Sequence, residues 1–419
     1  MCLLTLSCRE HSLEYSLFAT PELTALAWGT VEGIGTGLPV RLQYDYGSPV
    51  ACGATPQLDS LVEALAYVLQ RLYSASEGGP LVPGRDIRAV GHRVVHGGER
   101  FRQSVAIDGL VLAEIARLER LAPKYNRPNR AGIEAALQLL PAACHVAIFD
   151  TAFHQTLPPY AYHYPLPHDW YRKHGVRRYG FHGPSHLYLS RRAALRLGRD
   201  VADCRLITVH MELGISLCAI AGGCSVDTSM GFTPVEGTMQ ERRSGTIDPG
   251  IPGFMMDWQE LSAQQVEEVL NEKSGLLGVV GQGRGRRDVI ERANAGEARA
   301  ALAMRMECYG LRKYLGAYLA ALGGCDAIVF SCGQGALEAP LRQQLLQGLE
   351  AFGVHLDGSR NACSEHLQEE RCISPSQAAV QLWIIPTREE QVYAEDTLAV
   401  CAGSCREPWL QSYRFAREL

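Results

Sequence analysis

The feature that most constrains the fold of this chain is an order of predicted elements that occurs twice. Residues 2–19 have two apolar runs around a short polar break and predict a β-hairpin, and a third strand is predicted at 37–46. Residues 205–232 again have an apolar run, a break, an apolar run and a third strand, with Ser216 in the place of Ser12. This repetition predicts a duplicated α/β domain with a cleft between the copies.

Further elements predicted in each half alternate between helix and strand. The first half continues with a helix at 57–76, a strand entering a Gly-rich loop at 87–101, a helix near 108–120 and an apolar strand from 144. The second half continues with helices at 263–271 and 295–322 and an apolar strand from 326 that precedes another helix. In such α/β layers, ligands bind beyond the carboxyl ends of the strands.

Bulk composition excludes several classes of protein. A chain of 419 residues is long enough for two domains, and its 47% hydrophobic and 20% charged content is that of a packed globular protein. A net charge of -5 gives no reason to expect a nucleic-acid partner. No apolar run reaches membrane-spanning length and no charged signal-peptide segment begins the chain, so we expect a cytoplasmic protein without membrane contact.

The 14 cysteines do not form a recognisable framework. They are scattered through apolar surroundings and no C-x-x-C pair occurs. Cys401 and Cys405 come nearest to such a pair but lack histidine partners at zinc spacing. We therefore expect reduced, largely buried thiols.

Polar residues concentrate where predicted strands end. Taken singly, each segment has an ordinary explanation: an arginine in an ion pair, a histidine in a core hydrogen-bond network, or an aspartate that caps a helix. Together, and each with a Gly or Pro nearby, they predict a functional site. The segments are 91–100, 149–155, 177–186, 232–249 and 385–391.

These segments carry motifs that resemble the acetokinase family along nearly the whole chain. The motifs are, in chain order, GHRVVHGGE, FDTAFH, RRYGFHG and TSMGFTPVEG. The resemblance implies the duplicated actin-like, sugar-kinase-like (ribonuclease H-like) ATPase fold, with one domain at 1–154 plus 386–419 and the other at 155–385. It also implies a homodimer that transfers a phosphoryl group between ATP and a short-chain carboxylate, giving ADP and an acyl phosphate, with Mg²⁺ as cofactor.

The resemblance assigns roles on the phosphoryl side. Arg93 and Arg243 match the arginines that bind the carboxylate and stabilise the moving phosphoryl group, and His182 matches a histidine that hydrogen-bonds this group. Asp150 matches the acid that orients the phosphoryl group and its magnesium. Independently, phosphoryl transfer needs planar, bidentate cations on a spread negative charge, which arginine supplies.

Metal and acyl-pocket positions are implied in the same way. Ser7 and Glu389 match metal-linked positions, although Glu390 is an alternative to Glu389. The residues that match the pocket for the acyl methyl group are Val95, Phe181, Pro234 and Lys124.

The nucleotide side departs from the family pattern. Where the family has Asn-Ala-Gly-Ser-Ser-Ser-Leu-Lys in its first hairpin, this chain has SCREHSLE, so Glu14 reverses a charge that Arg9 and His11 are expected to offset only in part. Glu212 and Leu213 replace a glycine and an asparagine of the second hairpin. The residues at nucleotide-binding positions are Ser12, Glu14, His210, Gly214, Gly285, Arg287, Gly333 and Gly335. We therefore expect weak nucleotide binding.

Two functions stay open on this basis. One is a working acyl-phosphate-forming kinase with altered donor or acyl specificity, and the other is a weak or inactive member that acts as a binding or regulatory dimer. The family has leucine where this chain has Lys124, and two interpretations stay open. Either Lys124 faces the acyl pocket and the substrate is an acid with a second anionic or polar group, or Lys124 is directed to solvent and Tyr125 fills the gap. The dimer is expected to form through residues 149–158 and 180–194.

Overall fold

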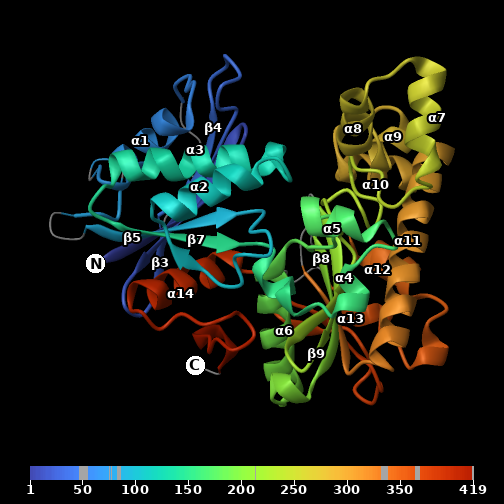
Figure 1. Ribbon diagram of the computed structural model, residues 1–419. Helices are drawn as coiled ribbons and strands as arrows, with labels where there is room; N and C mark the ends of the chain where they lie inside the picture. Colours follow the sequence, from blue (N-terminus) through green and yellow to red (C-terminus); the bar gives the residue numbers. More distant parts are fainter. Residues whose placement is uncertain are drawn as a thin grey trace. The chain divides into compact units, whose positions relative to one another are not determined.

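The computed structural model divides the chain into two compact units (Figure 1). One unit comprises Met1–Gln155 and Arg388–Arg417, and the other comprises Thr156–Thr387. The structure describes residues 1–46, 55–74, 76, 78–82, 86–212, 214–331, 338–363 and 369–417.

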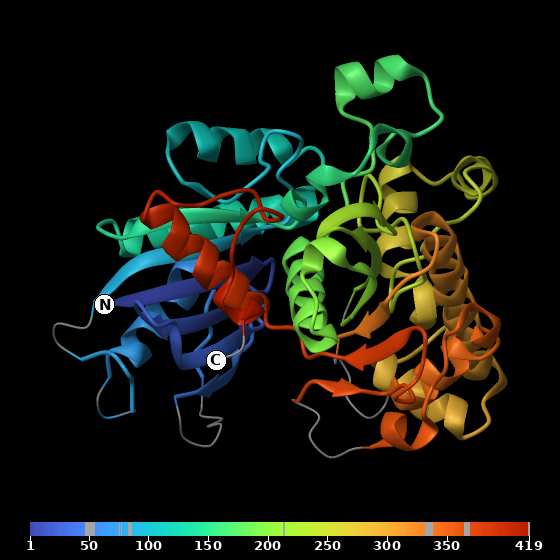
Figure 2. The same cartoon turned by 90° about the horizontal axis from the view of Figure 1, so that it is seen from below.

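The first unit is built on a seven-stranded sheet in the order β4-β3-β2-β1-β5-β7-β6. Helices α1 and α3 pack on one face, and α14 packs on the other (Figure 2). Leu4 and Leu6 of β1 point to the first face and Leu3 to the second, so this central strand is apolar throughout. The strands are β1 (Cys2–Arg9), β2 (Ser12–Ala19), β3 (Thr24–Glu32), β4 (Arg41–Asp45), β5 (Ile87–Val94), β6 (Val105–Ala106) and β7 (Cys144–Phe149). The helices are α1 (Leu61–Leu72), α2 (Gly109–Leu118), α3 (Pro123–Leu139) and α14 (Glu389–Cys401).

The second unit has a six-stranded sheet in the order β10-β9-β8-β11-β13-β12. Helix α6 (Gly183–Leu197) contacts β8 and β11, while α11 (Ala298–Leu322) contacts β8 and β9. The strands are β8 (Arg205–Met211), β9 (Ile215–Ala221), β10 (Cys224–Thr228), β11 (Ala327–Phe330), β12 (Arg371–Cys372) and β13 (Gln381–Ile384). The remaining helices are α4 (Pro159–Tyr162), α5 (His168–His174), α7 (Gly250–Gln259), α8 (Ala263–Glu272), α9 (Gly275–Val280), α10 (Arg286–Asn294), α12 (Ala339–Leu346) and α13 (Gly358–Ala362).

The two sheets share one topology. In each sheet, three strands pair in an antiparallel manner, and two further strands run parallel to the one that comes first in the sequence, β1 or β8. The strand orders are β3-β2-β1-β5-β7 in one unit and β10-β9-β8-β11-β13 in the other. A short antiparallel strand, β6 or β12, ends each sheet. The predicted duplication is confirmed.

One strand was placed wrongly from the sequence. The third strand of the first unit is β3 at Thr24–Glu32, and the predicted strand at 37–46 contains instead the fourth strand, β4. Only three of the nine residues of β3 are buried, so its apolar pattern is weak.

Two helices pack on a sheet other than the one that contains the strand preceding them in the sequence. Helix α6 follows β7 in the sequence but packs on the second sheet, and α14 follows β13 but packs on the first. The chain therefore passes between units after Gln155 and after Thr387, within two of the polar segments, 149–155 and 385–391. Across the residues that the structure describes, no helix is both long and apolar enough to span a bilayer.

Candidate active site

Arg93 and Asp150 form the centre of a polar group in the first unit. Arg93 lies near the end of β5, and Asp150 directly follows the parallel strand β7. The guanidinium donates from Nε to Oδ1 at 3.0 Å and from Nη2 to Oδ2 at 2.8 Å. Only 13% of the Arg93 side chain and 1% of the Asp150 side chain is exposed. This buried bidentate pair fixes the plane of the guanidinium.

Helix α14 brings a second carboxylate toward the same cation. Glu389 lies in its first turn and accepts a hydrogen bond from Tyr393 Oη at 2.7 Å. Burial would lower the pKa of Arg93, but the charges of Asp150, Tyr393 and Glu389 raise it well above its usual value. This interaction favours Glu389 over Glu390 as the site acid.

The loop after β5 is held by two asparagines of α3. Asn129 accepts a hydrogen bond from Val95 N at 2.9 Å and donates one to Cys8 O at 2.8 Å. Asn126 accepts from His96 N at 3.0 Å and donates to His96 O at 2.9 Å. Helix α3 thereby joins the Arg93 loop to the first hairpin.

A histidine network forms the polar group of the second unit. His182 precedes α6 with φ at +58°, a left-handed conformation uncommon for residues other than glycine. Its Nδ1 lies 2.8 Å from Ser216 Oγ, which also lies 2.9 Å from His186 Nε2. His186 Nδ1 lies 2.7 Å from Thr208 Oγ1, so fully buried partners hold His182 in place.

His210 extends this network. Its Nδ1 lies 2.8 Å from Ser185 Oγ, which lies 3.1 Å from Thr387 Oγ1. The rings of His210 and His182 are 4.1 Å apart between centroids. His210, predicted on the nucleotide side, therefore lies next to His182, predicted on the phosphoryl side.

Arg243 is connected to the same place through Gln240. Arg243 Nη1 donates to Gln240 Oε1 at 2.9 Å, and Gln240 Nε2 donates to Pro234 O at 2.8 Å. A Cβ added to Gly214 would lie 3.1 Å from His182 Cε1 and 3.3 Å from Gln240 Oε1. Glycine at 214 thus permits close approach of the β8–β9 turn to His182 and Gln240.

Arg178 holds the loop that contains Pro234. It forms a 2.6 Å ion pair with Glu236 and donates to the carbonyl groups of residues 228, 229 and 230. Phe181 and Pro234 are both buried. These two predicted pocket residues are therefore packed within the second unit, whereas Val95 belongs to the first.

The first hairpin shows how the reversed charge is accommodated. Glu14 pairs with Arg9 at 3.3 Å, with side chains 40% and 44% exposed. Across the strands, Ser7 is opposite Glu14 and Ser12 is opposite Arg9. Arg9 therefore offsets part of the Glu14 charge, as expected from the sequence.

The nucleotide positions beyond the hairpins lie around α10 and α12. Gly285 has φ at +134°, which strains any residue with a side chain, and it directly precedes α10. Arg287 is exposed and pairs with Glu291 at 3.0 Å. Gly333 and Gly335, in the segment before α12, lie outside the described residues, as does Leu213.

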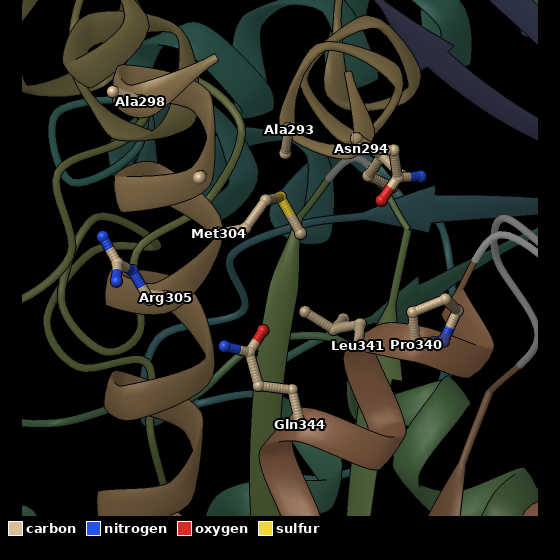
Figure 3. A pocket seen from close by; sticks show the side chains of 10 residues that line it. Ala293, Asn294, Ala298, Met304, Arg305, Pro340, Leu341 and Gln344 are labelled. Atoms are coloured by element: carbon tan, nitrogen blue, oxygen red, sulfur yellow. The ribbon is translucent and has the colours of Figure 1, made fainter. Parts of the chain in front are cut away.

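A pocket of about 340 Å³ lies between α10, α11 and α12 (Figure 3). Met304 of α11 and Leu341 of α12 project toward the space between the helices. Its walls are mostly apolar with a few polar groups, which is typical of ligand pockets. The lining residues are Ile290, Ala293, Asn294, Ala298, Ala301, Met304, Arg305, Pro340, Leu341 and Gln344.

Two expectations from the sequence lose their basis in the structure. Lys124 is exposed in the first turn of α3, so no ammonium is buried in an apolar pocket. The proposed dimer segments are also not exposed: Phe153, Phe181 and Leu189 are at most 1% accessible within the single chain. Their apolar side chains complete the monomer core and need no partner to cover them.

The carboxylates of the first unit fit the ligand preference of Mg²⁺. In the described part of the chain, no three His, Cys, Asp or Glu side chains gather as a ready-made metal site. Mg²⁺ is commonly held by one or two carboxylates together with waters and substrate phosphates. Asp150 and Glu389, which both act on Arg93, are the two carboxylates of this polar group.

Several residues that organise the site were missed from the sequence. Gln240, Tyr393 and the two asparagines of α3 act by positioning other groups, and a single sequence does not distinguish this role. Ser216 had a usable signal, because it occupies in the second hairpin the place of Ser12 in the first.

Comparisons with known proteins agree with this architecture. Residues 2–395 match the acetokinase family. Acetate kinase of Geobacter metallireducens is 46% identical over 100% of this chain and 99% of its own, and that of Methanosarcina thermophila is 41% identical over 95% and 96%. The crystal structure of Porphyromonas gingivalis acetate kinase superposes with a TM-score of 0.87 at 39% identity, covering 96% of this chain and 99% of that one. A propionate kinase from Francisella tularensis gives a TM-score of 0.86 at 32% identity, covering 95% and 99%.

These similarities confirm the predicted actin-like, sugar-kinase-like fold and the resemblance on which it was based. They extend over the whole chain and include the segments that carry Arg93, Asp150, His182 and Arg243. The chain belongs to the acetokinase family.

Proposed function

We propose that this chain catalyses reversible transfer of the terminal phosphoryl group of ATP to a short-chain carboxylate, giving ADP and an acyl phosphate. Membership of a family whose relatives include acetate and propionate kinases supports the reaction class. The observation that carries the proposal is the buried bidentate pair of Arg93 and Asp150. Such a pair pre-orients a planar cation for a carboxylate or phosphoryl group without covalent chemistry by the protein.

In this proposal Arg93 binds the carboxylate substrate and Asp150 fixes its guanidinium. Asp150 and Glu389 are the residues that would hold Mg²⁺, with Ser7 as a further oxygen donor. When bound, Mg²⁺ neutralises charge on the nucleotide phosphates. Tyr393 keeps Glu389 in place through its hydrogen bond.

In the second unit, His182 and Arg243 act on the transferring phosphoryl group. His182 is held by Ser216, and Arg243 by Gln240, so both reach the phosphoryl oxygens without large loss of side-chain entropy. Gly214 is proposed to bring backbone N–H groups of the β8–β9 turn to the phosphates.

The pocket between α10, α11 and α12 is proposed to take the nucleobase. Both helices that follow predicted nucleotide positions contribute to it: α10 begins after Gly285, and α12 follows the segment that contains Gly333 and Gly335. Its apolar lining suits a flat aromatic ring.

Acetate or propionate is the proposed substrate class. The partly exposed Val95 offers an apolar contact to a short acyl chain, and the exposure of Lys124 removes the reason to require a second anionic group. Trapping acyl phosphate as hydroxamate, with Mg-ATP and acetate, propionate, succinate or glycolate, tests this. We expect acetate and propionate to be used best, and Lys124→Leu to leave that order unchanged.

The second candidate, a weak or inactive binding dimer, is favoured by the substitutions on the nucleotide side at Glu14, Glu212 and Leu213. It predicts no hydroxamate with any of the four acids and no change in that result for Arg93→Ala. If the wild type forms acyl phosphate and Arg93→Ala does not, this second candidate is excluded.

We also propose a homodimer, formed through α7 rather than the segments expected from the sequence. Helix α7 has no buried residue, and Ile251, Phe254 and Trp258 are 47%, 61% and 76% exposed. A second copy is the proposed occupant of this apolar face. Light scattering should show a dimer for the wild type. The double variant Phe254→Asp, Trp258→Asp should be a folded monomer. A wild-type monomer at micromolar concentration would contradict this proposal.

A further inference from the structure

Two cysteine side chains meet at the end of the first unit that is remote from Arg93. Cys144 is the first residue of β7 and Cys401 is the last residue of α14. The thiol of Cys144 lies near enough to that of Cys401 to raise the pKa of Cys401. Asp150 and Glu389 lie at the opposite ends of the same strand and helix, about 18 Å away along each.

The packing of α14 on β7 brings the two cysteines to the same region of the first unit. Helix α14 packs on β7, and Cys144 lies against the same two apolar clusters as Leu398 and Val400, which precede Cys401. Cys144 is partly exposed and Cys401 is exposed, so a small oxidant reaches both. The thiols are therefore adjacent and accessible, a combination that isolated cysteines lack.

We propose that Cys144 and Cys401 form a reversible disulfide with a peroxide as the oxidant. One thiolate attacks the peroxide and becomes a sulfenic acid, releasing hydroxide, and the second thiol then displaces water from the sulfenic sulfur. In total, two thiols and one hydrogen peroxide give one disulfide and two waters. A small dithiol restores the reduced pair by exchange.

The surroundings of Cys401 assign the two steps. Burial and the contact with Cys144 raise the pKa of Cys401 to about 12, so Cys401 stays protonated and is the resolving thiol. Cys144 is then the residue that forms the sulfenic acid.

Other described thiols have different neighbours. Cys405 lies close in sequence to Cys401, but its thiol donates to Ser104 O at 3.6 Å. Cys363 is exposed and lies in the second unit, so it serves as the control for non-selective oxidation.

Mass spectrometry of the intact chain tests the proposal. The chain is treated with increasing hydrogen peroxide, free thiols are blocked, and linked peptides are identified without reduction. We expect a peptide joining Cys144 to Cys401, lost on reduction, present in Cys363→Ser and absent in Cys401→Ser and in Cys144→Ala. Because the bond ties α14 to β7, we also expect the oxidised form to melt a few degrees higher than the reduced form.

Three results would overturn the proposal. The first is that both thiols stay open to alkylation while Cys363 oxidises. The second is a linked peptide joining Cys401 to Cys405 instead. The third is an over-oxidised Cys144 with no linked peptide in the folded wild type, which would show that the two sulfur atoms do not meet. Cys401→Ser changes an exposed position, so loss of the linked peptide in this variant is not a consequence of misfolding.

Discussion

Asp150 binds the guanidinium of Arg93 through both carboxylate oxygens, at 3.0 Å to Nε and 2.8 Å to Nη2, with almost no solvent access to the carboxylate. The two residues come from the ends of parallel strands, so the sheet itself sets their separation. The geometry explains why the orientation of Arg93, and not only its charge, is expected to govern activity.

Asp150→Asn should reduce kcat by roughly 10²–10³-fold, because an amide offers one acceptor where the guanidinium needs two. Steady-state kinetics of acyl phosphate formation measure this. The matched control is Asp86→Asn, since Asp86 forms an exposed pair with Arg88 at 3.2 Å. Equal loss in both variants would show that the buried pair has no special role.

Gln240→Leu should lower kcat about tenfold or more with a smaller change in KM for the carboxylate, because Arg243, which acts on the transferring phosphoryl group, loses the acceptor that positions it. Gln240→Glu keeps an acceptor for Arg243 and should recover most of the loss. Gln57→Leu, at an exposed glutamine, is the control. If Gln240→Glu and Gln240→Leu behave alike, Gln240 does not position Arg243.

Glu14→Lys should tighten Mg-ATP binding several-fold, since it replaces a negative charge on the first hairpin with a positive one. Isothermal titration calorimetry at two salt concentrations measures the change, which should shrink at higher salt. Glu22→Lys is the control, because Glu22 is exposed in the turn between β2 and β3, at the other end of these strands from Glu14. Submicromolar Mg-ATP binding by the wild type would refute the expected weakness of the nucleotide site.

Acid should destabilise the first unit through His96. Burial lowers the pKa of His96 from 6.5 to about 3, so the unfolded state binds more protons between these values. The contribution of buried, neutral His96 to the free energy of unfolding is fully present above pH 6.5. It decreases as the pH falls, by about 2 kcal/mol at pH 5. His96→Asn, which keeps an acceptor for Gly98 N, should flatten the urea-unfolding profile between pH 7 and 5. The exposed His355→Gln should not; equal profiles for wild type and His96→Asn would count against this account.

The sequence predicted those parts of the molecule in which one residue carries a strong local signal. The duplicated sheet was predictable because β1, β2, β8 and β9 are buried strands with continuous or alternating apolar residues. Arg93 and Asp150 were singled out because they lie at or directly after the ends of strands, and His182 because it lies in the motif RRYGFHG. The contacts that hold the surrounding loops join distant segments of the chain. Gly214 lies close to Gln240, and Asn129 donates a hydrogen bond to Cys8 O across 121 residues.

Burial was the quantity least accessible from the sequence. Lys124 was weighed as a buried cation because the family has leucine at this position, but it is exposed in the first turn of α3, as the alternative hypothesis expected. Phe153 and Leu189 were taken as surface residues, although the core of each unit covers them. Helix α7 was not predicted, because Gly250, Pro252 and Gly253 in its first turn are residue types typical of loops.

Phosphorus NMR of the reverse reaction tests the central claim most directly. Acetyl phosphate and Mg-ADP are mixed with the chain, and the γ-phosphate resonance of ATP is followed with time. We predict that ATP appears as acetyl phosphate is consumed, and that Arg93→Ala abolishes this while Arg88→Ala does not. Release of inorganic phosphate without ATP, or equal rates for wild type and Arg93→Ala, would contradict the proposed phosphoryl transfer.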